Sequence, residues 1–341
     1  MRKNTPVIFE DRRKVWSTGM KELVLREKDY KETMDRVVLP YLKERQAQLW
    51  LERERGRKLY CMRYRAEQAA GVVLISHGFT ESAEKYREVI YYFLKNGFHV
   101  YCMEHCGHGH SYRLVEDLSL VHIDRYERYV EDLLFVAGTA RKENAGLPLY
   151  LYAHSMGGGI GAAAAAREPG CFAKLVLTSP MIRPETAPVP WGLARLIADI
   201  CCFLGKEKEY VMGQKPYEGL ELFAESASTS EVRFAYYQER RKAEPLYQIN
   251  APSYGWLRSA GRMNRYLRSK GWKQISVPVL LFQAERDDFV SLQEQERFIR
   301  KLSGRGEALL VKTTGTKHEI YNADETVLED YWERVFGFLK K

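Results

Sequence analysis

The stretch LYAHSMGGG, residues 151–159, places one serine between an apolar run and three consecutive glycines. Glycine loses more conformational freedom on folding than any other residue, so such a cluster indicates a backbone that passes close to something. Where a strand turns sharply into a helix around a serine, small residues are needed two positions before and after it, in the pattern G-x-S-x-G. Around Ser155 these positions are Ala153 and Gly157. The stretch therefore predicts a serine exposed on a sharp strand-to-helix turn.

Segments on both sides of this stretch alternate between strand-like and helix-like patterns. The strands we expect are residues 58–64, 72–76, 98–103, 149–152, 175–178, 279–282 and 308–312. The helices we expect are residues 84–95, 124–142, 156–167, 292–302 and 326–339. Strands that are apolar almost throughout are typical of a parallel sheet covered on both faces. The sequence therefore predicts an α/β fold with a mostly parallel sheet and helices on both faces.

Two regions interrupt this alternation. Residues 1–57 are highly charged and mostly helical in pattern, so we expect a helical N-terminal extension. Residues 183–273 lie between two expected strands and are rich in aromatic residues, proline and charge. A segment of this length is too long for a bare loop, so we expect a helical cap inserted into a core of residues 58–182 and 274–341. Within the cap, residues 251–256 have a turn-like pattern.

A reactive serine needs partners that lie elsewhere in the chain. Its hydroxyl becomes a good nucleophile when a histidine takes its proton, and a carboxylate must orient that histidine. In this architecture the chain order is serine, acid, histidine. The acid should follow a late strand, and we expect Asp287, with Asp288 and Glu285 as rivals in the same loop. The histidine should follow the next strand, which indicates His318 as the partner of Ser155.

The tetrahedral intermediate of acyl transfer carries a negative oxygen, which two backbone N–H groups normally bind. One should come from the residue after the serine, Met156, at a helix N-terminus where the helix dipole helps. The other should come from the loop after the strand at residues 72–76, where Gly78 permits a turn and Phe79 supplies the N–H. We therefore expect Phe79 and Met156 to form the oxyanion hole.

The chain has 341 residues, of which 45% are hydrophobic and 29% charged, as in an ordinary globular protein of one or two domains. Its net charge is +8, and most of this charge lies in residues 1–70. This pattern is typical of a solvated helical surface, and the alternative is weak attraction to anionic lipid headgroups or anionic substrates. We expect no nucleic-acid partner, because no nucleic-acid-binding motif accompanies the charge.

The sequence shows no signal-peptide pattern after its basic start and no apolar run of membrane-spanning length. Its six cysteines are scattered and typical of reduced thiols. We therefore expect a cytoplasmic protein with weak peripheral attachment to a membrane surface. His105, His108 and His110 share one loop, but no carboxylate or cysteine cluster accompanies them, so we expect no metal and no organic cofactor.

Several short sequence motifs occur in the order that is typical of a known group of enzymes. They are His77-Gly78 with Glu81, Ser82 and Tyr86; residues 104–111, with Glu104 for the usual aspartate; and residues 146–148, 154–158, 177–181, 284–290 and 318–319. Together they resemble the monoacylglycerol lipase and lysophospholipase group of α/β-hydrolases, over residues 58–182 and 275–340. In the cap, residues 244–245 and 252–257 look more like bacterial lysophospholipases. The resemblance implies the α/β-hydrolase fold.

The triad predicts ester hydrolysis through an acyl-enzyme, and the resemblance implies a lipid with one acyl chain, either a lysophospholipid or a monoacylglycerol. We expect Trp191, Leu196, Ile197 and Phe203 of the cap to hold that chain, because small-molecule sites are mostly apolar. Alternatives are an esterase or thioesterase for short soluble substrates and a non-catalytic ligand-binding protein on the same scaffold. An aminopeptidase of the same fold is a further alternative.

Overall fold

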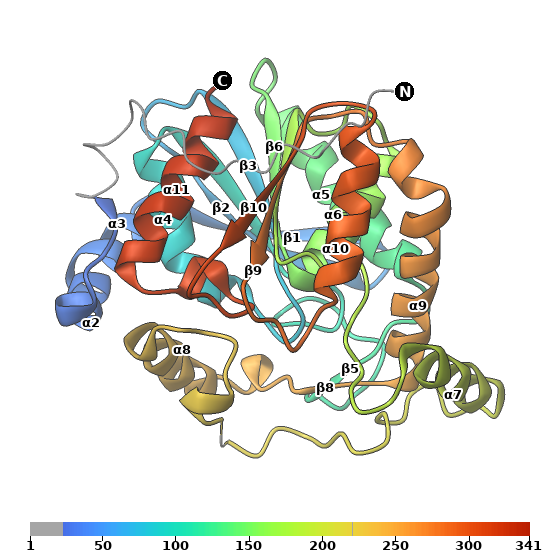
Figure 1. Cartoon of the computed structure of the whole chain (residues 1–341). Helices are drawn as coiled ribbons and strands as arrows, with labels where there is room; N and C mark the ends of the chain where they lie inside the picture. Colours follow the sequence, from blue (N-terminus) through green and yellow to red (C-terminus); the bar gives the residue numbers. More distant parts are fainter. Residues whose placement is uncertain (1–22, 220) are drawn as a thin grey trace.

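The computed structural model describes residues 23–219 and 221–341. An eight-stranded sheet lies at its centre, in the order β1-β2-β4-β3-β6-β7-β9-β10 (Figure 1). The strands are β1 Gln46–Glu54, β2 Arg57–Tyr64, β3 Gly71–Ser76, β4 Phe98–Met103, β6 Leu149–His154, β7 Lys174–Thr178, β9 Val279–Ala284 and β10 Ala308–Thr313. β2 is antiparallel to both of its neighbours, and every other neighbouring pair is parallel. The predicted mostly parallel sheet is confirmed.

Both faces of the sheet are buried. Every residue of β3, β6 and β9 is buried, and alternate residues belong to different cores. Leu149 and Leu151 pack into the core on one face, whereas Tyr150 and Tyr152 pack into the core on the other. A strand with two buried faces needs apolar residues at successive positions, which explains the unbroken apolar runs of the sequence.

Helices cover the two faces separately (Figure 1). One face is covered by α5 Tyr126–Glu143, α6 Ser155–Arg167 and α10 Leu292–Ser303, and the other by α4 Arg87–Lys95 and α11 Glu325–Leu339. Each of these helices corresponds to a helix expected from the sequence. They leave the carboxyl ends of the parallel strands free for the loops that carry the candidate site.

The N-terminal region departs from the expected helical extension. Residues 1–22 lie outside the described residues. Helical turns follow, comprising α2 Tyr30–Thr33, a π-helical turn Met34–Val38 and α3 Leu39–Lys43. Residues 46–54, which we expected to be helical, instead form β1, paired antiparallel with β2. The reason is a two-residue alternation, in which Leu49 and Leu51 pack against the core whereas Gln48, Trp50 and Glu52 are exposed.

The segment expected to form a cap contains three longer helices, α7 Trp191–Phe203, α8 Glu231–Ala243 and α9 Tyr254–Ser269. The turn-like stretch 251–256 was predicted only in part, because β8 Ala251–Pro252 pairs with β5 Leu120–Val121 and α9 then begins. Ser253 starts α9 by accepting a hydrogen bond from the amide of Trp256 at 3.1 Å. The division of the chain into a core and a cap stays a prediction.

Among the helices of residues 23–219 and 221–341, none has both the length and the apolar character required to cross a membrane.

Candidate active site

The backbone turns sharply at Ser155, between the end of β6 and the start of α6, with a φ of 51°. This conformation is uncommon for a residue with a side chain and marks a strained turn. A Cβ at Gly157 would lie 2.1 Å from the carbonyl oxygen of Ser76, so a side chain does not fit there. Ala153 fits because it faces Gly161, whose own Cβ would lie 3.4 Å from that of Ala153. At that distance the methyl group of Ala153 makes an ordinary van der Waals contact, whereas a Cβ at Gly161 would lie 2.4 Å from Cδ2 of Leu151.

Three side chains from the carboxyl ends of β6, β9 and β10 meet at this turn. Nε2 of His318 lies 2.8 Å from Oγ of Ser155, and Nδ1 of His318 lies 2.7 Å from Oδ2 of Asp287. The second oxygen of Asp287, Oδ1, accepts the amides of Phe289 and Val290, each at 3.0 Å. The side chains of His318 and Asp287 are buried. We call residues 314–322, which carry His318, the histidine loop.

The two rival acids have other positions. Oε2 of Glu285 accepts the amide of Gly315, at the start of the histidine loop, at 2.6 Å. Asp288 is exposed. Asp287 is therefore the acid of this loop that is hydrogen-bonded to His318, as the chain order predicts.

Opposing effects act on the proton affinity of His318. Burial lowers the pKa of His318, but the adjacent carboxylate of Asp287 raises it, and the net pKa lies above the ordinary value of 6.5. The ring of His154 packs on that of His318, with centroids 4.8 Å apart. Burial lowers the pKa of His154 to about 3, so this neighbour stays neutral. The site therefore favours a positive charge on His318 in particular.

The two candidate oxyanion amides leave the sheet side by side. β3 and β6 are adjacent parallel strands in which Ser76 pairs with Ala153. Phe79 and Met156 each follow these paired residues by three positions, so both amides lie at the carboxyl edge of the sheet. The ring of Phe79 packs against Trp256 of α9, with centroids 4.6 Å apart. This placement is compatible with the predicted oxyanion hole.

Glu81 is a buried carboxylate to which the sequence analysis assigned no role. It accepts the amide of Gly78 at 2.5 Å, the hydroxyl of Tyr86 at 2.6 Å and the hydroxyl of Tyr321 at 2.7 Å. Lys85 lies 3.4 Å away as a counter-charge. Burial alone would raise the pKa of Glu81, but nearby positive charge and these hydrogen bonds hold it well below its usual range. Glu81 thus connects the loop of Phe79 to the histidine loop.

His77, His105 and His108 pack against one another. The ring of His77 lies 4.7 Å from that of His105 and 5.0 Å from that of His108. Burial lowers the pKa of all three, so they are neutral packing groups. Glu104, in the same loop, accepts the amide of His110 at 2.6 Å. Within the described part of the chain, no three His, Cys, Asp or Glu side chains are grouped as metal ligands would be.

The four side chains expected to hold an acyl chain do not share one environment. Trp191 and Ile197 are partly buried against the core. Leu196 and Phe203 are 55% and 89% exposed, so the structure does not bring them into a closed pocket. α7 is apolar almost all round, and for this reason its sequence does not indicate which face packs inward.

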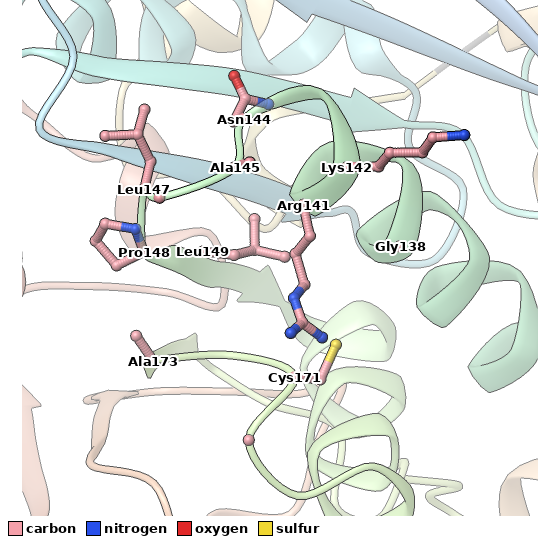
Figure 2. Close-up of a pocket in the computed structure, with 12 residues that line it drawn as sticks. Gly138, Arg141, Lys142, Asn144, Ala145, Leu147, Pro148, Leu149, Cys171 and Ala173 are labelled. Atoms are coloured by element: carbon pink, nitrogen blue, oxygen red, sulfur yellow. The ribbon is translucent and has the colours of Figure 1, made fainter.

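A cavity of about 520 Å³ lies at the other end of β6. Figure 2 shows Arg141 and Lys142 from the end of α5, Leu149 at the start of β6, and Cys171. Because Ser155 follows the last residue of β6, this cavity and the triad lie at opposite ends of the strand. We assign the cavity no part in the candidate site.

The chain is a serine hydrolase with the α/β-hydrolase fold. This class is defined by the mostly parallel sheet, the strained turn at the serine and the hydrogen-bonded triad of serine, histidine and aspartate. A family model described as serine aminopeptidase, S33, matches residues 67–325, and the chain belongs to this family. Family membership defines the fold and the class of enzyme, and the following relatives indicate the subgroup.

Two relatives align over most of the chain. Lysophospholipase L2 of Escherichia coli K12 is 29% identical over 266 residues, which cover 76% of this chain and 77% of that protein. Monoacylglycerol lipase of Mycolicibacterium smegmatis is 28% identical over 271 residues, covering 79% of this chain and 89% of that protein. These matches confirm the resemblance identified from the sequence phrases.

Solved structures agree on the fold. A monoglyceride lipase from Saccharomyces cerevisiae, in complex with a substrate analog, aligns with a TM-score of 0.68 and 18% identity, over 86% of this chain and 94% of that one. A thermostable carboxyl esterase from Bacillus coagulans aligns with a TM-score of 0.71 and 18% identity, over 87% and 98%. At this level of identity the likeness establishes the α/β-hydrolase fold.

Proposed function

We propose that the protein hydrolyses carboxylic esters of lipids with a single acyl chain, through an acyl-enzyme on Ser155. The observation that carries the proposal is the hydrogen-bonded line from Ser155 through His318 to Asp287. An imidazole in such a line takes the serine proton as the hydroxyl attacks a carbonyl. The lipid class is supported by the two relatives, one named a lysophospholipase and the other a monoacylglycerol lipase.

Each step uses one of these groups. His318 takes the proton of Ser155 as Oγ attacks the ester carbonyl, and Asp287 stabilises the imidazolium that forms. The amides of Phe79 and Met156 stabilise the negative oxygen of the tetrahedral intermediate. His318 then gives its proton to the leaving alcohol. In the second half His318 takes a proton from a water molecule, whose oxygen attacks the acyl carbonyl. The bond between the acyl carbon and Oγ of Ser155 then breaks, His318 returns its proton to Oγ, and the fatty acid leaves.

The same proposal includes the residues that contact the acyl chain of the substrate and the kind of headgroup that the substrate carries. Trp191 and Ile197, which pack inward from α7, are the proposed contacts of the acyl chain. The net charge of +8 favours an anionic phosphate headgroup, and therefore a lysophospholipid over a monoacylglycerol. The proposed steps use no metal ion and no organic cofactor.

Substrate profiling tests the proposal. We expect release of fatty acid from a lysophosphatidylcholine and a monoacylglycerol, 4-nitrophenyl esters cleaved best with long acyl chains, and no turnover by Ser155→Ala. A preference for acetyl esters would favour the soluble esterase or thioesterase. Cleavage of aminoacyl anilides in place of esters would favour an aminopeptidase. A folded protein that binds lipid but turns over no ester would favour a ligand-binding role.

We propose also that the protein associates weakly with membrane surfaces through the outer face of α7. The side chains of this face are between 49% and 89% exposed; they are Leu193, Leu196, Ile200, Phe203 and Leu204. Leu193, Leu196, Ile200 and Phe203 follow one another at spacings of three or four residues, which places them on one side of the helix. Leu204 directly follows the end of α7. A helix that presents such a face gains free energy by burying it at a lipid interface, and a net positive charge adds attraction to anionic lipid.

A further inference from the structure

The helical segment at residues 24–43 precedes the family match and packs against two separate elements. Its helices contact α4, which covers one face of the sheet, and α8, which lies in the segment expected to form a cap, residues 183–273. Tyr30 packs edge-to-face on Tyr236 of α8, with ring centroids 5.6 Å apart. Asp35 accepts the hydroxyl of Tyr236 at 2.7 Å. This N-terminal segment thus connects the sheet layer to α8.

Arg233 of α8 is the buried centre of that connection. Its side chain is fully buried, with Nη2 3.0 Å from Oε1 of Glu88 on α4. Nη2 also donates to the carbonyl of Leu25 at 2.8 Å. Glu88 accepts in addition the hydroxyl of Tyr30 at 2.9 Å. Because a buried charge is strongly destabilised without its partners, this pair fixes α8, α4 and the N-terminal segment relative to one another.

The residues before α8 hold the histidine loop. We call residues 223–230 the bracing segment. The amide of Glu319 donates to the carbonyl of Ala227 at 2.9 Å. Oγ of Ser228 donates to the carbonyl of Asn322 at 2.7 Å. These two hydrogen bonds lie one and four residues after His318, so they restrain the loop directly beside the imidazole.

The bracing segment is itself anchored where α8 begins. Ser230 is the N-cap residue of α8, and its hydroxyl accepts the amide of Arg233 at 3.5 Å. The same hydroxyl donates to the carboxylate of Glu27 in the N-terminal segment. Arg233 therefore lies one turn into the helix that the bracing segment enters. A continuous set of contacts runs from Glu88 through Arg233 and the bracing segment to His318.

We propose that Arg233 is a positioning residue for His318, since it anchors the bracing segment that holds the histidine loop. The inference rests on the proposed function, in which His318 is the base. Catalytic groups act well only when held close to their productive geometry, and His318 lies in a loop outside any strand or α-helix. The position of the His318 imidazole thus depends on contacts between three distant parts of the chain, namely the N-terminal segment, α4 and α8.

The test uses the full chain with Arg233→Met combined with Glu88→Gln, so that no buried charge is left unpaired. We expect kcat for a soluble 4-nitrophenyl ester to fall about 10- to 100-fold, with little change in KM. The far-downfield proton resonance of the hydrogen bond between His318 and Asp287 should be lost or shifted. The control Arg334→Met removes an arginine from the surface ion pair with Asp330 on α11, and should leave both readouts unchanged.

Ser228→Ala provides a second and milder test, because it removes the hydroxyl that holds Asn322 without disturbing a buried charge. It should lower kcat several-fold and shift the same resonance. The inference is overturned if either variant, shown to be folded by circular dichroism, keeps both the wild-type kcat and the wild-type resonance. A wild-type protein that hydrolyses no ester would contradict the proposed function instead, and the resonance would still decide the positioning of His318.

Discussion

His318 connects the two other residues of the candidate triad, and its environment determines when it can act as a base. Burial disfavours its charged form, whereas the carboxylate of Asp287 favours it, and the second effect is larger because the net pKa is raised. The same carboxylate is fixed by the amides of Phe289 and Val290, so its position does not depend on the histidine. At the scale of single residues, Asp287 therefore stabilises the positive charge that His318 gains when it takes the serine proton.

The pH dependence of hydrolysis follows from this balance. The neutral imidazole accepts the serine proton, so kcat/KM should rise with pH through the pKa of His318, above the ordinary value of 6.5. Asp287→Asn removes the group that raises this pKa. The rise should move to lower pH, and kcat should fall by about 10⁴-fold. Initial rates on a soluble ester across acid and neutral pH measure both changes.

Asp288→Asn is the matched control, because Asp288 is an exposed acid in the same loop. It should leave the pH profile and kcat unchanged. An equal loss in the two variants would assign the role of the acid to the loop charge in general rather than to Asp287.

Glu81 makes a second prediction at the residue scale. Glu81→Leu leaves the amide of Gly78 and the hydroxyls of Tyr86 and Tyr321 without their acceptor, whereas Lys85 keeps its ion pair with Glu319. We expect the free energy of unfolding to fall by about 3–5 kcal/mol, because each buried donor left without an acceptor costs about 1–3 kcal/mol. Urea unfolding measures it.

Glu116→Leu replaces an exposed glutamate and should change the free energy of unfolding by no more than about 0.5 kcal/mol. If the two variants were equally stable, the network around Glu81 would not be a source of stability.

At the scale of elements, the strands that are buried on both faces were the ones that the sequence predicted best. The strands of the sheet were predicted to within one or two residues, because two-sided burial leaves an apolar run of matching length. β1 was missed because Gln46–Glu54 consists largely of good helix formers, and its pairing with β2 overrides that preference. The start of α9 was missed because Pro252-Ser253-Tyr254-Gly255 has a turn composition, although Ser253 is also a helix-capping residue.

The candidate site was predictable where chain order constrains it. Ser155, Asp287 and His318 each follow a parallel strand, and parallel strands end at one edge of the sheet. The contacts of Glu81 and Arg233 could not be predicted in this way. They join segments that are far apart in sequence, so they arise only once the whole chain is packed.

The turn at Ser155 gives a prediction at the element scale. A Cβ at Gly157 would lie 2.1 Å from a backbone oxygen of β3, so Gly157→Ala forces α6 away from the sheet. We expect about 1–3 kcal/mol less stability, as for an overpacked core, together with loss of activity. Thermal unfolding followed by circular dichroism measures the first effect.

Gly138→Ala is the control for this variant. Gly138 is exposed within α5, and an added Cβ there meets nothing within 4 Å. The change should raise stability by about 0.4–1 kcal/mol, since alanine is the better helix former. If Gly157→Ala behaved in the same way, the close approach of α6 and β3 would not be required.

At the scale of the whole molecule, the two ends of the parallel strands carry different features. The triad lies at the carboxyl ends of the strands, on the side from which the inserted segment of α7 and α8 projects (Figure 1). The opposite end of β6 carries the cavity with Arg141 and Lys142. The exposed apolar face of α7 belongs to residues 183–273, which also hold the histidine loop through Ala227, and this is the arrangement that the proposed membrane association requires.

Removing part of that apolar face tests the membrane proposal. Ile200→Ser combined with Leu204→Ser lowers the apolar area of α7 and of the residue that follows it, because the two side chains are 49% and 63% exposed. Binding to vesicles of phosphatidylcholine and phosphatidylglycerol should weaken about tenfold or more, because each aliphatic side chain contributes about 1.5–3 kcal/mol when fully buried. Vesicle sedimentation measures the bound fraction.

Hydrolysis of a short soluble ester should be unchanged in this variant, which separates binding from chemistry. Phe135→Ser, which removes an exposed aromatic side chain from α5, serves as the control. Equal vesicle binding by the α7 variant and the wild type would contradict the proposed surface.

The most direct test of the central claim is covalent labelling of the folded protein by a fluorophosphonate, followed by mass spectrometry of the intact chain and its peptides. An activated Ser155 predicts one adduct on the peptide that contains residues 151–159, no adduct in Ser155→Ala, and much slower labelling in His318→Ala. A folded wild-type protein that stays unlabelled at Ser155, or that is labelled equally well without His318, would contradict the account.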